Sequence, residues 1–133
     1  MYQDNHTPTV LVVEDDAEMN ELERELLAVH GFESIPAFNG PQAIDLVQST
    51  RTDAVLLDVM LPLMDGFEAC VQMRKVRDGG FPIIIISALN EEDCRRRGME
   101  SGASAYFTKP FNPEEIISTL RRLIGQNQQP ANL

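Results

Sequence analysis

Carboxylate side chains follow two apolar runs of the sequence. Glu14, Asp15 and Asp16 come directly after "TVLVV". Asp58 comes directly after "DAVLL". A half-buried carboxylate is costly unless a partner compensates its charge, and two carboxylates about 5 Å apart repel by roughly 3 kcal/mol at an effective dielectric constant near 20. If both runs end at the same edge of a sheet, we expect a hard divalent cation there, and Mg²⁺ suits a shell of carboxylate oxygens, a backbone carbonyl and water.

Two further apolar runs end in groups that bind phosphate oxygens. Ser87 follows "PIIII", and Lys109 follows "SAYFT". A cation, a hydroxyl and an ammonium arranged around one carboxylate form a receptor for a phosphoryl group. Because a carboxylate can attack phosphorus and form an aspartyl phosphate, Asp58 is the candidate nucleophile.

Five short apolar runs alternate with segments of helical period, which is typical of a doubly wound α/β domain. The predicted strands are residues 9–13, 33–38, 53–57, 82–87 and 104–108, and the predicted helices lie near 17–30, 41–49, 66–77, 90–100 and 113–124. Five such units commonly form a flavodoxin-like parallel sheet of order 2-1-3-4-5, in which ligands bind beyond the carboxyl ends of the first and third strands. The second strand contains Pro36, so we expect it at an edge. The acidic ends of the first and third strands would then meet.

Polar residues and glycines mark the expected helix ends. Asp16, Asp65 and Asn112 stand where helix N-caps are needed. Gly31 and Gly125 stand where helices are expected to end. These positions support the boundaries given above.

Four ordered blocks of this sequence, "VLVVEDD", "AVLLDVMLPLMDG", "PIIIISA" and "GASAYFTKPF", resemble the signature blocks of the response-regulator receiver domain. This CheY-like domain is the phospho-acceptor module of two-component signalling, and the resemblance covers residues 9–124. It implies that Asp58 is the phospho-acceptor and that Ser87 and Lys109 contact the phosphoryl group. It also implies a cis peptide bond between Lys109 and Pro110.

The resemblance further implies Mg²⁺ as the cofactor and a switch that responds to phosphorylation. The implied metal ligands are Glu14, Asp15, Asp58 and the backbone carbonyl of Met60. Ser87 would move toward the phosphoryl group, and Tyr106, the implied aromatic switch, would fill the vacated space from the outer side. Met60 and Leu89 occupy the two positions that flank the phosphoryl group in this family and influence its hydrolysis.

The helix expected over 90–100 has few apolar anchors beyond Cys94 and Met99, and a weakly anchored helix is easier to shift. Together with the strand over 104–108 and the last helix, it is the expected output surface. Three arginines at 95–97 stand four residues after three acidic residues at 91–93, which predicts local ion pairs on a solvated face. A partner surface is the alternative interpretation of this arginine run.

The implied function is transfer of a phosphoryl group from a sensor histidine kinase or a histidine phosphotransfer protein to Asp58. Catalysis would be limited to the domain's own phosphorylation and dephosphorylation. An aspartate-nucleophile phosphatase is the nearest rival, but that chemistry needs a second acid where this chain has Met60. A flavin-binding domain is disfavoured because "EDDAE" after the first strand would repel a phosphate, and a constitutive interaction module would not need the complete site.

Composition limits the class of protein further. The chain has 133 residues and a formal net charge of -10, so we expect no direct nucleic-acid binding, which requires a basic surface. No apolar run is long enough to span a bilayer, and we expect a cytoplasmic domain with reduced cysteines. We predict a receiver domain over 9–125, a disordered segment over 1–8 and a flexible tail or linker over 126–133. The oligomeric state is expected to be a monomer or a phosphorylation-dependent dimer.

Overall fold

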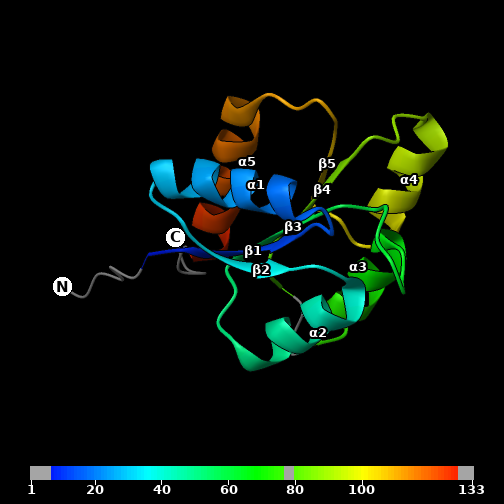
Figure 1. The fold of residues 1–133 in the computed structure, drawn as a ribbon, viewed down its shortest axis with the longest axis horizontal. Helices are drawn as coiled ribbons and strands as arrows, with labels where there is room; N and C mark the ends of the chain where they lie inside the picture. The colour runs from blue at the N-terminus through cyan, green and yellow to red at the C-terminus, as the bar shows by residue number, and fades with distance from the viewer. Residues whose placement is uncertain (1–6, 77–79, 129–133) are drawn as a thin grey trace.

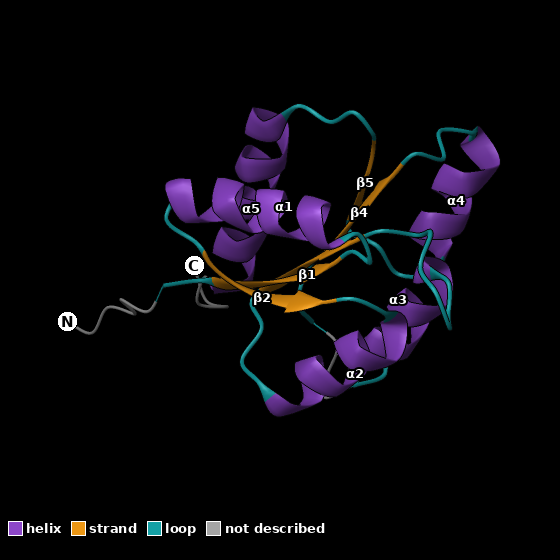
Figure 2. Ribbon diagram, viewed as in Figure 1, coloured by secondary structure: helices purple, strands orange, loops and turns teal. Residues whose placement is uncertain are grey.

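A parallel five-stranded sheet forms the centre of the computed structural model, which describes residues 7–76 and 80–128 (Figure 2). Its order is β2-β1-β3-β4-β5, so the predicted flavodoxin-like topology is confirmed. The strands are β1 (Thr9–Val13), β2 (Glu33–Ala37), β3 (Ala54–Leu57), β4 (Ile83–Ser87) and β5 (Ala105–Thr108). β2, which contains Pro36, lies at an edge of the sheet as expected.

Helices cover both faces of the sheet. Helices α1 (Ala17–Val29) and α5 (Pro113–Gln128) lie on one side, and α2 (Gly40–Ser49), α3 (Gly66–Arg74) and α4 (Glu92–Glu100) lie on the other (Figure 1). Alternate strand residues therefore enter two apolar clusters. In β1, Leu11 and Val13 face the cluster under α2 and α3, whereas Val10 and Val12 face the cluster under α1 and α5. Burial on both faces explains why the central strands are apolar at nearly every position.

The predicted helix N-caps are confirmed. Asp16 Oδ1 accepts hydrogen bonds from the amides of Glu18 and Met19, at 3.0 and 3.1 Å. Asp65 and Asn112 cap α3 and α5 in the same way. Such side chains satisfy amides that have no partner inside the helix.

Several helix ends differ from the prediction by one to four residues; α3, for example, ends at Arg74 rather than near residue 77. Gly31, at φ 90°, directly follows His30, the C-cap of α1, as expected. The prediction that Gly125 ends the last helix is wrong, because α5 continues to Gln128. A helical glycine costs only about 1 kcal/mol relative to alanine, which this apolar-faced helix tolerates. Helix α4 begins at Glu92 rather than at residue 90.

The ends of the chain correspond only in part to the expected segments. Residues 1–6 and 129–133 lie outside the described residues. Pro8, expected in a disordered segment, accepts a 2.9 Å hydrogen bond from the amide of Glu33 at the start of β2. Residues 126–128, expected in the tail, belong to α5. Among the described residues, no helix has both the length and the apolar character needed to cross a membrane.

Candidate functional site

Three carboxylates meet where the strand order of the sheet reverses. Glu14 and Asp15 follow β1, and Asp58 follows the neighbouring strand β3, whose Leu57 pairs with Val13. One carboxylate oxygen from each of the three residues lies within 4.8 Å of the others. Glu14 and Asp58 are 3% and 8% exposed, whereas Asp15 is exposed to solvent. The predicted acidic cluster is therefore present at the carboxyl end of the sheet.

Lys109 supplies positive charge to two of these carboxylates. Its Nζ donates hydrogen bonds to Glu14 Oε1 at 2.8 Å and to Asp58 Oδ2 at 3.0 Å. Burial lowers the pKa of this ammonium, but its hydrogen bonds to Glu14 and Asp58 outweigh burial, so the pKa lies above its ordinary value. Lys109 is therefore a permanent cation in this site. The peptide bond between Lys109 and Pro110 is cis, as predicted.

The donor set fits a divalent cation. Burial raises the pKa of Glu14, and the hydrogen bonds from Lys109 and from the Asp16 amide only partly oppose this rise. The Glu14 carboxylate thus needs more positive charge than one ammonium provides. Carboxylate oxygens are the ligands that Mg²⁺ prefers, and the exposed Asp15 leaves one side of the cluster open to water.

The backbone around Asp58 is held by a close approach of α3. The Gly66 amide donates to the Val59 carbonyl at 2.8 Å, and a Cβ at Gly66 would lie 2.6 Å from the Val59 Cα and still closer to the Asp58 carbonyl. The Asp58 amide donates to Val13 in β1 at 3.0 Å. The sequence predicts only the helix cap at Asp65, and the contribution of Gly66 to placing Asp58 was not predicted.

Ser87 and Tyr106 are linked through one residue of the β4–α4 loop. The Leu89 amide donates to Ser87 Oγ at 3.1 Å, and the Tyr106 hydroxyl donates to the Leu89 carbonyl at 2.6 Å. Ser87 is fully buried, and Tyr106 is 7% exposed. The resemblance implies that the Tyr106 ring fills space vacated by Ser87 from the outer side, and in this structure the ring is buried.

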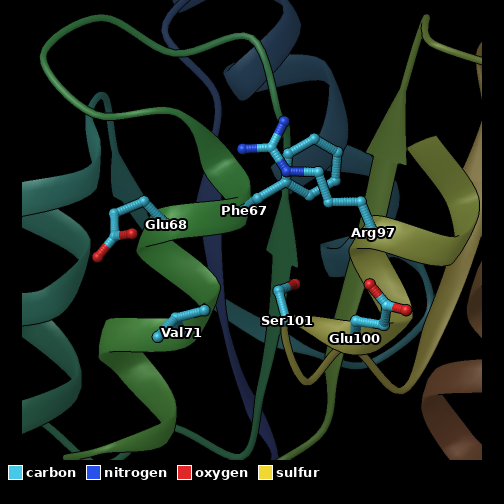
Figure 3. A pocket seen from close by; sticks show the side chains of 6 residues that line it. All are labelled: Phe67, Glu68, Val71, Arg97, Glu100 and Ser101. Atoms are coloured by element: carbon cyan, nitrogen blue, oxygen red, sulfur yellow. The ribbon is translucent and has the colours of Figure 1, made fainter. Parts of the chain in front are cut away.

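Arginines attach α4 to its neighbours. The Arg95 guanidinium donates to the Tyr106 carbonyl at 3.1 Å and lies 5.3 Å from the centre of its ring. Arg97 lies across Phe67 of α3 at 4.5 Å, beside a cavity of about 210 Å³ between α3 and α4 (Figure 3).

Two expectations about α4 are corrected by these contacts. A local ion pair forms between Arg96 and Asp93, but Arg95 and Arg97 contact residues outside the helix. Met99, expected as an apolar anchor, is 48% exposed.

Two buried polar residues on the inner face of α1 were not predicted from the sequence. Asn20 is fully buried and Glu23 is 6% exposed. Burial, and the nearby negative charge of Glu14, raise the pKa of Glu23 to about 7. The spacing of Asn20, Glu23 and the buried Leu27 fits one helix face, and this periodicity could have indicated both residues.

Comparison with known proteins identifies the family. Residues 10–121 match the response regulator receiver domain. The chain belongs to this family. Among solved structures, the receiver domain of Francisella response regulator 1452 is 30% identical, with a TM-score of 0.86 over 92% of this chain and 100% of that chain. The receiver domain of a sensor histidine kinase from Pseudomonas aeruginosa PAO1, with a magnesium ion coordinated in its active-site cleft, is also 30% identical, with a TM-score of 0.83 over 90% and 99%.

Curated relatives include longer response regulators. Response regulator MprA of Mycolicibacterium vanbaalenii is 40% identical over 115 residues, which are 86% of this chain and 49% of the relative. The chain thus spans about half the length of the curated relatives that it matches. Its membership identifies it as a receiver domain of two-component signalling, which is a phospho-accepting domain.

Proposed function

We propose that this domain accepts a phosphoryl group on Asp58, in a Mg²⁺-dependent reaction, from a sensor histidine kinase or a histidine phosphotransfer protein. The observation that carries the proposal is the cluster of Glu14, Asp15 and Asp58, with Lys109 bonded to two of its members. The domain would catalyse only its own phosphorylation and dephosphorylation. Its two free cysteines fit a reducing compartment such as the cytoplasm.

The carboxylates of Glu14, Asp15 and Asp58, with the backbone carbonyl of Met60, would hold the cation. When bound, Mg²⁺ screens the charge of the carboxylates and of the incoming phosphoryl group. The magnesium in the cleft of the Pseudomonas receiver domain supports this assignment.

In the transfer step, a carboxylate oxygen of Asp58 forms a bond to phosphorus. The phosphorus–nitrogen bond of the donor phosphohistidine breaks, and its electron pair stays on the imidazole nitrogen. Lys109 and the Ser87 hydroxyl contact the phosphoryl oxygens and stabilise their charge. In hydrolysis, a water oxygen bonds to phosphorus, Asp58 leaves as a carboxylate, and a water proton passes to phosphate or solvent.

The response to phosphorylation would pass through Leu89. A phosphoryl group that draws the Ser87 hydroxyl toward itself disturbs the bond from the Leu89 amide to Ser87. The carbonyl of the same residue holds the Tyr106 hydroxyl, and Arg95 of α4 lies over the Tyr106 ring. The change would therefore reach the surface formed by α4, β5 and α5, which we propose as the output surface for a partner or for a phosphorylation-dependent dimer.

Incubation with Mg²⁺ and acetyl phosphate, followed by intact mass measurement, tests the proposed function. We expect a single phosphoryl adduct on the wild-type protein, no adduct with a chelator present, and no adduct on Asp58→Asn. Turnover of many acetyl phosphate molecules without an adduct would instead indicate a phosphatase. An adduct that persists on Asp58→Asn would overturn the assignment of Asp58.

A further inference from the structure

The polar side chain of Asn20 in α1 is completely buried. Its exposed fraction is 0%, and its Nδ2 lies 3.0 Å from the Glu14 carbonyl, 3.1 Å from the Ala37 carbonyl and 3.2 Å from the Val12 carbonyl. Its Oδ1 accepts a 2.8 Å hydrogen bond from Arg24 Nε, one helical turn further along. A flipped amide would turn its oxygen toward three carbonyls, so Arg24 and these carbonyls together determine the amide orientation.

The Asn20 amide joins the ends of two strands. β1 and β2 end at Val13 and Ala37, and the last backbone bond between them runs from the Glu14 amide to the Ala37 carbonyl, at 3.0 Å. Asn20 Nδ2 donates to the carbonyls of both residues that this bond joins, Glu14 and Ala37. Glu14 is thereby held at its amide by β2 and at its carbonyl by α1, at the point where the chain leaves the sheet.

This anchorage does not depend on Lys109. The Glu14 carboxylate accepts from Lys109 and from the Asp16 amide, but its backbone is held through Asn20 and Ala37. In the proposed function, Lys109 turns to the phosphoryl group. The acidic residues must then keep their position by other contacts, and the Asn20 amide provides one.

We propose that Asn20, oriented by Arg24, is a positioning residue for the divalent cation site formed by Glu14, Asp15 and Asp58. This inference rests on the proposed function. Mg²⁺ demands nearly ideal octahedral geometry, so a small displacement of the β1–α1 loop weakens binding. Residues that support metal ligands typically contribute 10- to 100-fold to affinity, and we expect about a tenfold weaker affinity for Mg²⁺ without the amide.

The test compares four variants. Asn20→Leu removes the amide at similar size, and Asn20→Asp keeps an acceptor for Arg24 but loses the donors to the three carbonyls. Arg24→Met removes only the group that orients the amide. Leu27→Ala is the matched control, because Leu27 is fully buried on the same helix face but is placed in the apolar cluster under α1 and α5.

Two readouts separate positioning from general destabilisation. Titration calorimetry of the unphosphorylated protein gives the Kd for Mg²⁺, and urea unfolding in a chelator gives the stability of each variant. We expect Kd to rise about tenfold in both Asn20 variants, to rise less in Arg24→Met, and to stay unchanged in Leu27→Ala despite its lower stability. With acetyl phosphate, the half-saturating Mg²⁺ concentration should rise by the same factor, with little change of rate at saturation.

The outcomes are distinguishable. If the wild-type protein neither binds Mg²⁺ nor becomes phosphorylated, the proposed function fails. If the wild-type protein does both, but the Asn20 variants bind Mg²⁺ as tightly as it does, the inference about Asn20 is wrong. Equal weakening in Leu27→Ala would also overturn it, since the effect would then follow stability alone. If both Asn20 variants fail to fold, an unchanged Kd in Arg24→Met decides against the inference.

Discussion

At the scale of single residues, Met60 and Leu89 occupy the two positions that, by the resemblance to receiver domains, flank the phosphoryl group. Both line a cavity of about 470 Å³ with Val59, Leu61 and Phe67, and neither side chain can orient an attacking water. We expect Met60→Asn combined with Leu89→Glu to shorten the lifetime of the phosphoryl group, because amide and carboxylate groups can position water for hydrolysis.

The lifetime can be measured by mass spectrometry after the phosphodonor is removed. The single variants serve as controls that show which position contributes. Slower loss of the phosphoryl group from the double variant than from the wild-type protein would contradict this prediction.

Glu23 makes a separate prediction about pH. Its pKa is raised to about 7 in the folded protein, chiefly by burial, so between pH 4.5 and 7 the folded state holds a proton that the unfolded state has released. The stability contributed by this proton is complete below pH 4.5 and is lost as pH rises through 7. The glutamine side chain of the Glu23→Gln variant cannot lose a proton. The free energy of unfolding of this variant, relative to that of the wild-type protein, should therefore rise by about 2 to 3 kcal/mol between pH 4.5 and 7.

Urea unfolding of both proteins in a chelator, at pH 4.5 to 8, measures this gain. The chelator removes divalent cations, whose charge would alter the ionisation of Glu23. Glu25→Gln is the matched control, because Glu25 is exposed on the same helix. A difference between Glu23→Gln and the wild-type protein that does not change with pH would show that Glu23 ionises as freely in the folded state as in the unfolded state.

The positions of residues could be predicted from sequence where they end an apolar strand or directly follow one. Asp58, Ser87 and Lys109 are of this kind, because the parallel topology brings the strand ends to one edge. Asn20 and Glu23 lie inside a helix, and their burial depends on how α1 packs on the sheet. A local sequence pattern does not determine which atoms such side chains meet.

At the scale of elements, α4 is held by arginine–aromatic contacts in place of an apolar face. Within α4, which lies wholly in the described part of the chain, Gly98 is the one buried residue, and a Cβ there would lie 2.8 Å from the Tyr106 ring. The local spacing of acidic and basic residues predicted ion pairs within the helix. The partners of Arg95 and Arg97 lie on β5 and α3, and such distant partners could not be derived from spacing along the chain.

Removing one of these contacts should loosen α4 without unfolding the domain. Arg97 stacks on Phe67 and lies 3.7 Å from Asp65 Oδ2, so we expect Arg97→Leu to speed amide hydrogen exchange in α4. An exposed cation–π contact contributes about 0.5 to 1 kcal/mol, and exchange should accelerate about two- to fivefold. Arg96→Leu is the control, because the ion pair of Arg96 lies within its own helix. Equal acceleration in both variants would show that Arg97 does not hold α4 against α3.

At the scale of the whole molecule, the fold was predictable because its signals repeat. Five apolar runs, each followed by a helical segment, are typical of a doubly wound sheet, whose common order is 2-1-3-4-5. Right-handed crossovers then determine which face of the sheet each helix covers. The least predictable parts were the ends, such as the continuation of α5 through Gly125. There the choice depends on about 1 kcal/mol, which residue preferences alone do not resolve.

The net charge of -10 and the acidic cluster together predict how the molecule responds to cations. A ligand that binds only the folded state stabilises it by about 2.7 kcal/mol at a concentration 100 times its Kd. Mg²⁺ at that concentration should therefore raise the free energy of unfolding in urea by about 2 to 3 kcal/mol, whereas KCl at the same ionic strength only screens the general repulsion. Asp15→Asn combined with Asp58→Asn should respond to both salts alike, because two of the three carboxylates are neutralised. If KCl stabilises the wild-type protein as much as Mg²⁺ does, the cations act on net charge, and the cluster of Glu14, Asp15 and Asp58 is not a specific site.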